Sequence, residues 1–224
     1  MSERSAPPGR ALAWLSFMGV LALIAYAGRI GGGEPDRDVL YSYSVFVGAV
    51  LQYGLMLGIL LWIAKGLPKR EVFALRRPST GTWATIGLTA GTLVGIFVIS
   101  AALDPFLDAG EEQGLTPDGW DPDRAKQYAA SFVAVAIIAP IVEELTFRGE
   151  GFFLLGRYGR GVAIVGTALA FGLGHGLLVG LPILVVFGLG LALLRDRTAS
   201  VYPGIALHAL FNAIALIAAV TIDV

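Results

Sequence analysis

The sequence predicts an all-α fold, a multi-pass transmembrane bundle of seven or eight helices. Charged residues make up only 15% of the 224 positions, whereas soluble domains average about 25%. Hydrophobic residues make up 56%, and they gather in runs close to the roughly 20 residues that cross a bilayer. The 30 glycines fit the same class, because small residues let membrane helices approach each other closely.

Seven apolar segments are expected to form the helices. The fourth can continue towards Arg157, and the sixth is short and carries Pro182, which suits a tilted or partly re-entrant helix. We predict an N-terminal transmembrane region, 1–127, that ends in an external acidic loop, 104–127, and a C-terminal core, 128–222. The expected segments are 11–28, 39–64, 82–103, 129–147, 161–179, 181–194 and 203–222.

The first segment has two interpretations. Arg4 and Arg10 precede the apolar run, and Ala25-Tyr26-Ala27 resembles a signal-peptidase site. The run is long for the core of a signal peptide, however, and many further spans follow it. A first transmembrane helix is therefore the favoured interpretation.

The loops predict the orientation in the membrane. If seven spans alternate, most loop cations fall on one side, and the positive-inside rule then places the N-terminus in the cytoplasm and the C-terminus outside. We expect a protein of the cell membrane, in contact with its lipids. The cations are Arg4, Arg10, Lys65, Lys69, Arg70, Arg76, Arg77, Arg157, Arg160, Arg195 and Arg197.

Composition also excludes several kinds of site. The chain has no Cys, so it can form no disulfide, thiol nucleophile or thiolate metal site. The net charge of −1 gives no reason to expect a nucleic-acid partner.

Polar residues cluster inside the apolar segments of the C-terminal half. A charge near the bilayer centre costs about 2.5–3.5 kcal/mol or more, so such residues normally face a bundle interior and serve a function. The only two histidines of the chain belong to this set. Its members are Glu143, Glu144, Arg148, His175, His208 and Asn212.

Spacing suggests how these residues divide their roles. Glu144 and Arg148 are four positions apart and can pair on one helix face, while Glu143 is rotated about 100° from Glu144 and can point into a site. A carboxyl group in such a dry place can serve as a general base.

The other two segments each place two functional groups one turn apart. Phe171 shares a helix face with His175 and can orient its imidazole. His208 shares a face with Asn212, and together they can donate hydrogen bonds to one oxygen. Glu143 lies 14 residues from Arg157, or roughly 21 Å, and the groups on the other two segments lie at similar depths. The sequence therefore predicts one polar layer.

Less specific interpretations stay open at this point. The Glu-Glu-Arg set can be a structural ion pair, each His can be a packing residue, and Asn212 can be ordinary polar glue between membrane helices. At the level of function, a membrane immunity or scaffold protein and a proton-coupled transporter are the alternatives to an enzyme.

Three motifs in order resemble a known family. Glu-Glu-x-x-x-Arg (143–148), Phe-x-x-x-His (171–175) and His-x-x-x-Asn (208–212) are similar to the motif series of the CAAX prenyl endopeptidases and bacteriocin-processing membrane proteases, the Ras-converting endopeptidase type. The resemblance covers about 128–215. It implies eight helices and an intramembrane endopeptidase whose substrate is a prenylated CAAX-type tail, a leader or bacteriocin-type peptide, or a membrane protein.

The resemblance also implies a role for each residue. Glu143 and His175 would activate a water molecule, and His208 and Asn212 would form the oxyanion hole. The roles of bracing and shaping the site would fall to Glu144, Arg148 and Phe171.

Members of this family have also been described as metalloproteases. Glu143, His175 and His208 would be the ligands if Zn²⁺ is present, because a carboxylate and two imidazoles leave the fourth position open. We prefer the metal-free glutamate mechanism, which requires no cofactor.

Overall fold

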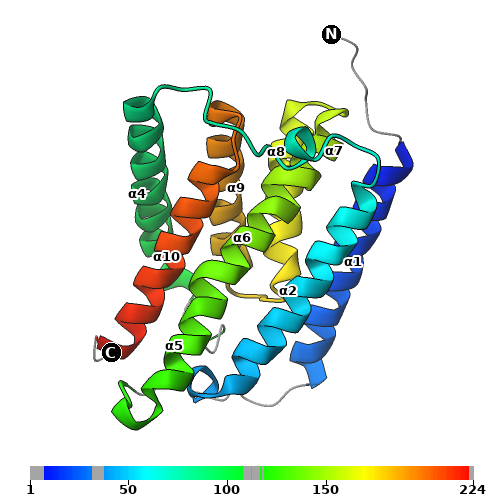
Figure 1. Ribbon diagram of the computed structural model, residues 1–224. Helices are drawn as coiled ribbons and strands as arrows, with labels where there is room; N and C mark the ends of the chain where they lie inside the picture. The colour runs from blue at the N-terminus through cyan, green and yellow to red at the C-terminus, as the bar shows by residue number, and fades with distance from the viewer. Residues whose placement is uncertain (1–7, 32–37, 108–111, 113–116, 118, 222–224) are drawn as a thin grey trace.

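The computed structural model describes residues 8–31, 38–107, 112, 117 and 119–221, and within them it is helical with no strands (Figure 1). An all-α bundle, as the sequence predicts, is therefore confirmed. The elements in chain order are α1 (Pro8–Gly31), η1 (Val39–Tyr41), α2 (Tyr43–Ile63), α3 (Lys69–Val72), α4 (Thr82–Leu107), η3 (Pro122–Arg124), α5 (Ala125–Val133), η4 (Ala134–Ile138), α6 (Ala139–Glu144), η5 (Leu145–Gly151), α7 (Phe152–Gly156), α8 (Arg160–Gly174), α9 (Leu181–Thr198) and α10 (Tyr202–Thr221).

Five helices of the described chain are long and apolar enough to cross a membrane, which makes this a membrane protein. They are Gly9–Ile30, Tyr43–Ile63, Thr82–Leu107, Pro122–Gly156 and Tyr202–Thr221.

Three predicted boundaries were wrong. The fifth segment does not reach 179, because α8 ends at Gly174 and the chain turns at Gly176, whose φ of +66° is easily reached only without a side chain. The sixth is longer than 181–194 and ends at Thr198, where Ala199 takes up the left-handed conformation. The loop predicted to begin at 104 begins later, because α4 continues through Pro105 to Leu107.

A single long rod carries the first motif. The elements from η3 to α7 join into one continuous helical stretch of 35 residues, Pro122–Gly156, which extends past 147 as the sequence analysis anticipated. Two stretches of it, η4 and η5, are π-helical, and they flank the short α6 that holds Glu143 and Glu144. Wider π turns are frequent at functional sites, because they change which way the following side chains point.

The rod crosses the middle of the bundle (Figure 1). In this view α1 and α2 lie to its right, α10 and α4 to its left, and α8 and α9 behind it. Helix α8 packs mainly against α9, and α4 sits at the periphery against α9 and α10. This arrangement brings α2, α6, α8, α9 and α10 around one interior space.

Helix α1 is an integral part of the fold. Trp14 is fully buried, and its indole Nε1 donates a hydrogen bond to the backbone oxygen of Thr146 at 3.1 Å. A Cβ atom at Gly151 would overlap the Trp14 ring, so the glycine permits this close approach. The structure therefore packs α1 into the bundle as a helix long and apolar enough to cross a membrane.

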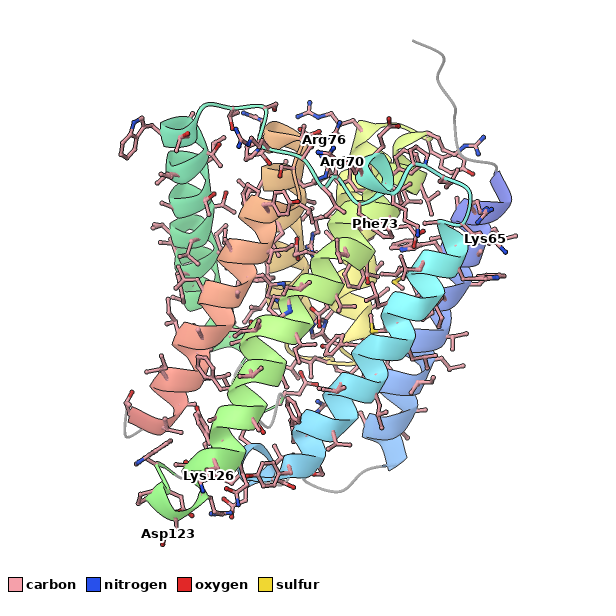
Figure 2. All side chains as sticks on the ribbon, viewed as in Figure 1. Lys65, Arg70, Phe73, Arg76, Asp123 and Lys126 are labelled. Atoms are coloured by element: carbon pink, nitrogen blue, oxygen red, sulfur yellow. The ribbon has the colours of Figure 1, made fainter. Side chains whose placement is uncertain are left out.

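The two ends of the bundle carry different charges. Figure 2 shows the cations Lys65, Arg70 and Arg76 at one end, and both Asp123 and Lys126 at the other. Helix α1 begins and α10 ends at opposite ends of the bundle, as an odd number of crossings requires (Figure 1). Which end faces the cytoplasm stays a prediction.

Candidate active site

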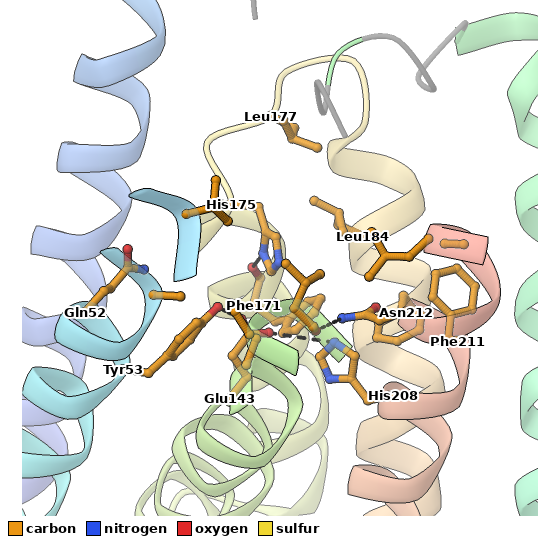
Figure 3. Close-up of a pocket in the computed structure, with 18 of the residues that line it drawn as sticks. Gln52, Tyr53, Glu143, Phe171, His175, Leu177, Leu184, His208, Phe211 and Asn212 are labelled. Carbon is orange, nitrogen blue, oxygen red and sulfur yellow. Dashed lines mark hydrogen bonds and ion pairs between the residues drawn. The ribbon is translucent and has the colours of Figure 1, made fainter. Parts of the chain in front are cut away.

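One cavity gathers residues from all three motifs. Glu143, Phe171, His175, His208 and Asn212 all line a space of about 650 Å³ (Figure 3). Helices α2, α6, α8, α9 and α10 and the π turn η4 supply its walls. The single polar layer inferred from helix depth thus corresponds to a real hollow.

Glu144 and Arg148 form a buried brace beside this cavity. Both side chains are fully buried, and the Arg148 guanidinium donates to Glu144 Oε1 at 2.8 Å and to the Gly188 backbone oxygen at 2.8 Å. The other Glu144 oxygen faces Gly204 of α10, where a Cβ atom would come within 2.7 Å of it. The glycine therefore lets α10 pack directly on the carboxylate.

Glu143 points the other way, towards α2. The Tyr53 hydroxyl donates a hydrogen bond to Glu143 Oε1 at 2.6 Å, and Glu143 Oε2 lies 3.8 Å from His208 Nε2. The carboxylate is nearly buried, with 8% of the residue exposed. The two neighbouring glutamates thus have different hydrogen-bond partners, Tyr53 for Glu143 and Arg148 for Glu144, as the 100° rotation between them predicts, and both lie near His208.

Each histidine uses Nδ1 for support. His208 Nδ1 lies 3.2 Å from Glu144 Oε1, and His175 Nδ1 lies 2.8 Å from the Phe171 backbone oxygen. Both partners can only accept, so both Nδ1 atoms carry a proton. In the neutral ring this leaves Nε2 as the basic nitrogen.

Phe171 lies between the two imidazoles and the arginine. Its ring centroid is 4.6 Å from that of His175 and 5.7 Å from that of His208. The Arg148 guanidinium carbon stands 4.7 Å from the same ring, a cation–π distance. One aromatic ring therefore fixes the relative positions of three polar groups.

Asn212 is held from one side only. Its Nδ2 donates to the Val135 backbone oxygen of η4 at 2.9 Å. An amide carries two N–H groups, so a second donor is available to a molecule in the cavity.

Whether Glu143, His175 and His208 hold Zn²⁺ stays a prediction. Among the described residues, no group of three His, Asp or Glu side chains lies close enough in this arrangement to hold a metal ion. The mechanism proposed below uses the side chains themselves.

Sequence reasoning missed several residues of the site. Gln52 and Tyr53 line the cavity from α2, and Phe187 and Phe211 pack around His208 and Asn212. An adjacent Gln and Tyr in the middle of an otherwise apolar segment was a usable signal. A further buried acid, Glu150, lies on the same rod, and neither of its oxygens has a hydrogen-bond partner.

The loop after His175 is tied down by other parts of the chain. The Glu112 carboxylate accepts hydrogen bonds from the backbone N–H groups of Leu178 and Gly180, both at 2.7 Å, and Tyr26 of α1 donates to the Leu177 backbone oxygen at 3.0 Å. Partial burial would raise the pKa of Glu112, but these N–H donors, helped by Arg29, outweigh it and hold that pKa below its ordinary value.

Comparison with known proteins gives one match. No curated protein and no solved structure matches the chain. A protein-family model, described as type II CAAX prenyl endopeptidase Rce1-like, matches residues 125–214. This stretch contains every candidate site residue predicted from the sequence, and Tyr53 lies outside it. The resemblance seen in the three motifs is thus confirmed, because the segment that builds the cavity's polar wall matches the model of the Rce1-like type II CAAX prenyl endopeptidase family.

Proposed function

We propose that this protein is an intramembrane endopeptidase in which Glu143 and His175 activate a water molecule. The observation that carries the proposal is the meeting of Glu143, His175, His208 and Asn212 in one cavity within the apolar bundle. The family match over residues 125–214 supports the reaction class.

The side chains can divide the reaction between them. Water attacks the scissile carbonyl carbon while its proton passes to Glu143 or to the basic Nε2 of His175. The carbonyl oxygen becomes an oxyanion and accepts hydrogen bonds from Asn212 and from His208. The tetrahedral intermediate then collapses, the C–N bond breaks, and the proton is returned to the leaving amine.

The buried pair of Glu144 and Arg148 bears on the protonation that His208 needs in this mechanism. To donate from Nε2 as well as Nδ1, this ring must be doubly protonated. Glu144 accepts the Nδ1–H hydrogen bond, and the Arg148 guanidinium, 2.8 Å away, holds Glu144 in place. A charged donor strengthens the hydrogen bond to a developing oxyanion.

The substrate we propose is a peptide or protein segment that reaches this depth of the membrane. A prenylated CAAX-type tail, a leader or bacteriocin-type peptide, and a membrane protein all remain candidates. The cavity walls are mostly apolar, with Val135, Leu184 and Phe187 among them, which suits a hydrophobic segment.

Replacing the base tests the proposal. Glu143→Gln should lower cleavage of a peptide library by purified protein at least about 10²-fold, because the amide cannot accept the proton. The Tyr53 hydroxyl can still donate to the carbonyl oxygen of the introduced amide, so the fold should survive. Equal cleavage by wild type and variant would reject the proposal.

Chelation and transport assays separate the alternatives. Activity that persists after stringent metal removal supports the metal-free mechanism, and activity restored only by Zn²⁺ contradicts it. A scaffold or immunity protein would keep its function in Glu143→Gln, and a proton-coupled transporter would show flux driven by a proton gradient.

A further inference from the structure

The hydroxyl of Tyr53 is the closest polar contact that the Glu143 carboxylate makes. The two oxygens are 2.6 Å apart, a short hydrogen bond of the kind formed by an O–H donor and a charged acceptor (Figure 3). Tyr53 comes from α2, 90 residues away in sequence and outside the stretch that matches the family.

The contact makes the two Glu143 oxygens inequivalent. Oε1 is occupied by Tyr53, whereas Oε2 faces His208 Nε2 at 3.8 Å. At that separation the two groups do not form a direct hydrogen bond. A reacting water that approaches Glu143 therefore finds one oxygen already used and the other presented towards the second histidine.

We infer that Tyr53 is a positioning residue for the proposed protease reaction: its hydroxyl fixes the Glu143 carboxylate so that Oε2 is the oxygen that receives the proton from water. Without this donor the carboxylate could rotate about its last bond, because that torsion is broad for Glu. A misplacement of about 1 Å at a catalytic group can cost about 10²-fold in rate.

The structure argues against a purely structural role. Tyr53 lines the cavity beside Gln52, and the residue is only partly buried. Its hydroxyl donates to the Glu143 carboxylate rather than to a backbone group. Tyr128 offers the contrast. Its hydroxyl donates to the Leu216 backbone oxygen at the same 2.6 Å, but Tyr128 does not line this cavity.

Two matched substitutions test the inference. Tyr53→Phe and Tyr128→Phe each remove one hydroxyl from a short hydrogen bond and keep the ring. We expect Tyr53→Phe to lower kcat about 10- to 100-fold while KM stays within about twofold, because orientation of the base acts on the chemical step. Tyr128→Phe should keep kcat within about twofold and reveal its loss only in the thermal unfolding temperature.

The outcomes separate this inference from the function on which it rests. A Tyr53→Phe enzyme whose kcat falls no further than that of Tyr128→Phe, or whose KM rises while kcat is unchanged, would overturn the positioning role and leave the protease standing. A wild-type protein that cleaves no peptide, compared with Glu143→Gln as baseline, would reject the proposed function and the role of Tyr53 together. Elution as a folded monodisperse species, checked for each variant, ensures that rates refer to folded protein.

Discussion

At the scale of single residues, the buried charge of Arg148 carries a large desolvation cost. Its guanidinium is fully enclosed and offsets its lost hydration with Glu144, the Gly188 backbone oxygen and the Phe171 ring. Buried ion pairs often add little net stability, but removing one partner leaves the other charge uncompensated.

Arg148→Met should therefore be strongly destabilising. We expect a loss of about 3–5 kcal/mol of unfolding free energy, since Glu144 would remain buried without its guanidinium partner. Thermal unfolding of wild type and variant in detergent measures this loss of stability. The double variant Glu144→Leu with Arg148→Met should recover much of the stability but no cleavage, because His208 loses its acceptor. If the double variant were as unstable as the single one, the charge argument would be wrong.

Most of the residue-level predictions came from spacing. The pairing of Glu144 with Arg148 and the packing of Phe171 on His175 follow from positions four apart on a helix, and the structure contains both contacts. The catalytic roles assigned to them stay predictions. Tyr53 could not be found in this way, since it reaches Glu143 from a helix 90 residues earlier and no local pattern encodes that contact.

At the scale of elements, the loop between α8 and α9 decides where His175 sits. His175 caps the end of α8, and only five residues, 176–180, separate it from α9. Glu112 and Tyr26 hold this short turn from outside. The position of His175, a proposed base, therefore depends on the hydrogen bonds of the Glu112 carboxylate, a group that can be protonated.

Protonation of Glu112 at acid pH should weaken its hold on this loop. A carboxyl whose folded-state pKa lies below its ordinary value of 4.5 stabilises the fold above that value, and this contribution is lost as pH falls through the lower folded pKa. We expect Glu112→Gln to unfold at a lower temperature than wild type near neutral pH. The gap should close as pH drops below about 4.5. A gap that stays constant into acid would show that the ionised carboxylate is not responsible.

The helix boundaries show where sequence reasoning reached its limit. Apolar length and composition placed each long helix, because a bilayer imposes both. The π turns η4 and η5 were not foreseen, since hydrophobic runs carry no mark of one extra residue per turn. The 100° rotation between the two glutamates still applied, because both lie in the α-helical stretch α6.

At the scale of the whole molecule, the loop charges make a prediction about orientation. Lys69 and Asp123 are both exposed. Figure 2 shows Arg70, the neighbour of Lys69 in sequence, at the end of the bundle opposite Asp123. The chain contains no Cys, so single cysteines can be introduced without background.

Labelling of intact cells with a membrane-impermeant maleimide tests this orientation. We expect Asp123→Cys to react from outside and Lys69→Cys to react only in inverted vesicles or after permeabilisation. The opposite pattern would place the N-terminus outside. Labelling at both positions from one side would contradict a crossing of the membrane by α4, the long helix between them.

The wall of the cavity is drawn from two separate parts of the chain. Residues 125–214 provide the groups that we propose to react, while α2 closes the opposite side with Gly48, Ala49, Gln52 and Tyr53. The groups proposed to react and the wall that would contact the cleaved segment can consequently be changed separately. Grafting a foreign second helix onto this scaffold, with Tyr53 retained, is a direct way to redirect the enzyme towards new sequences without disturbing its means of breaking the bond.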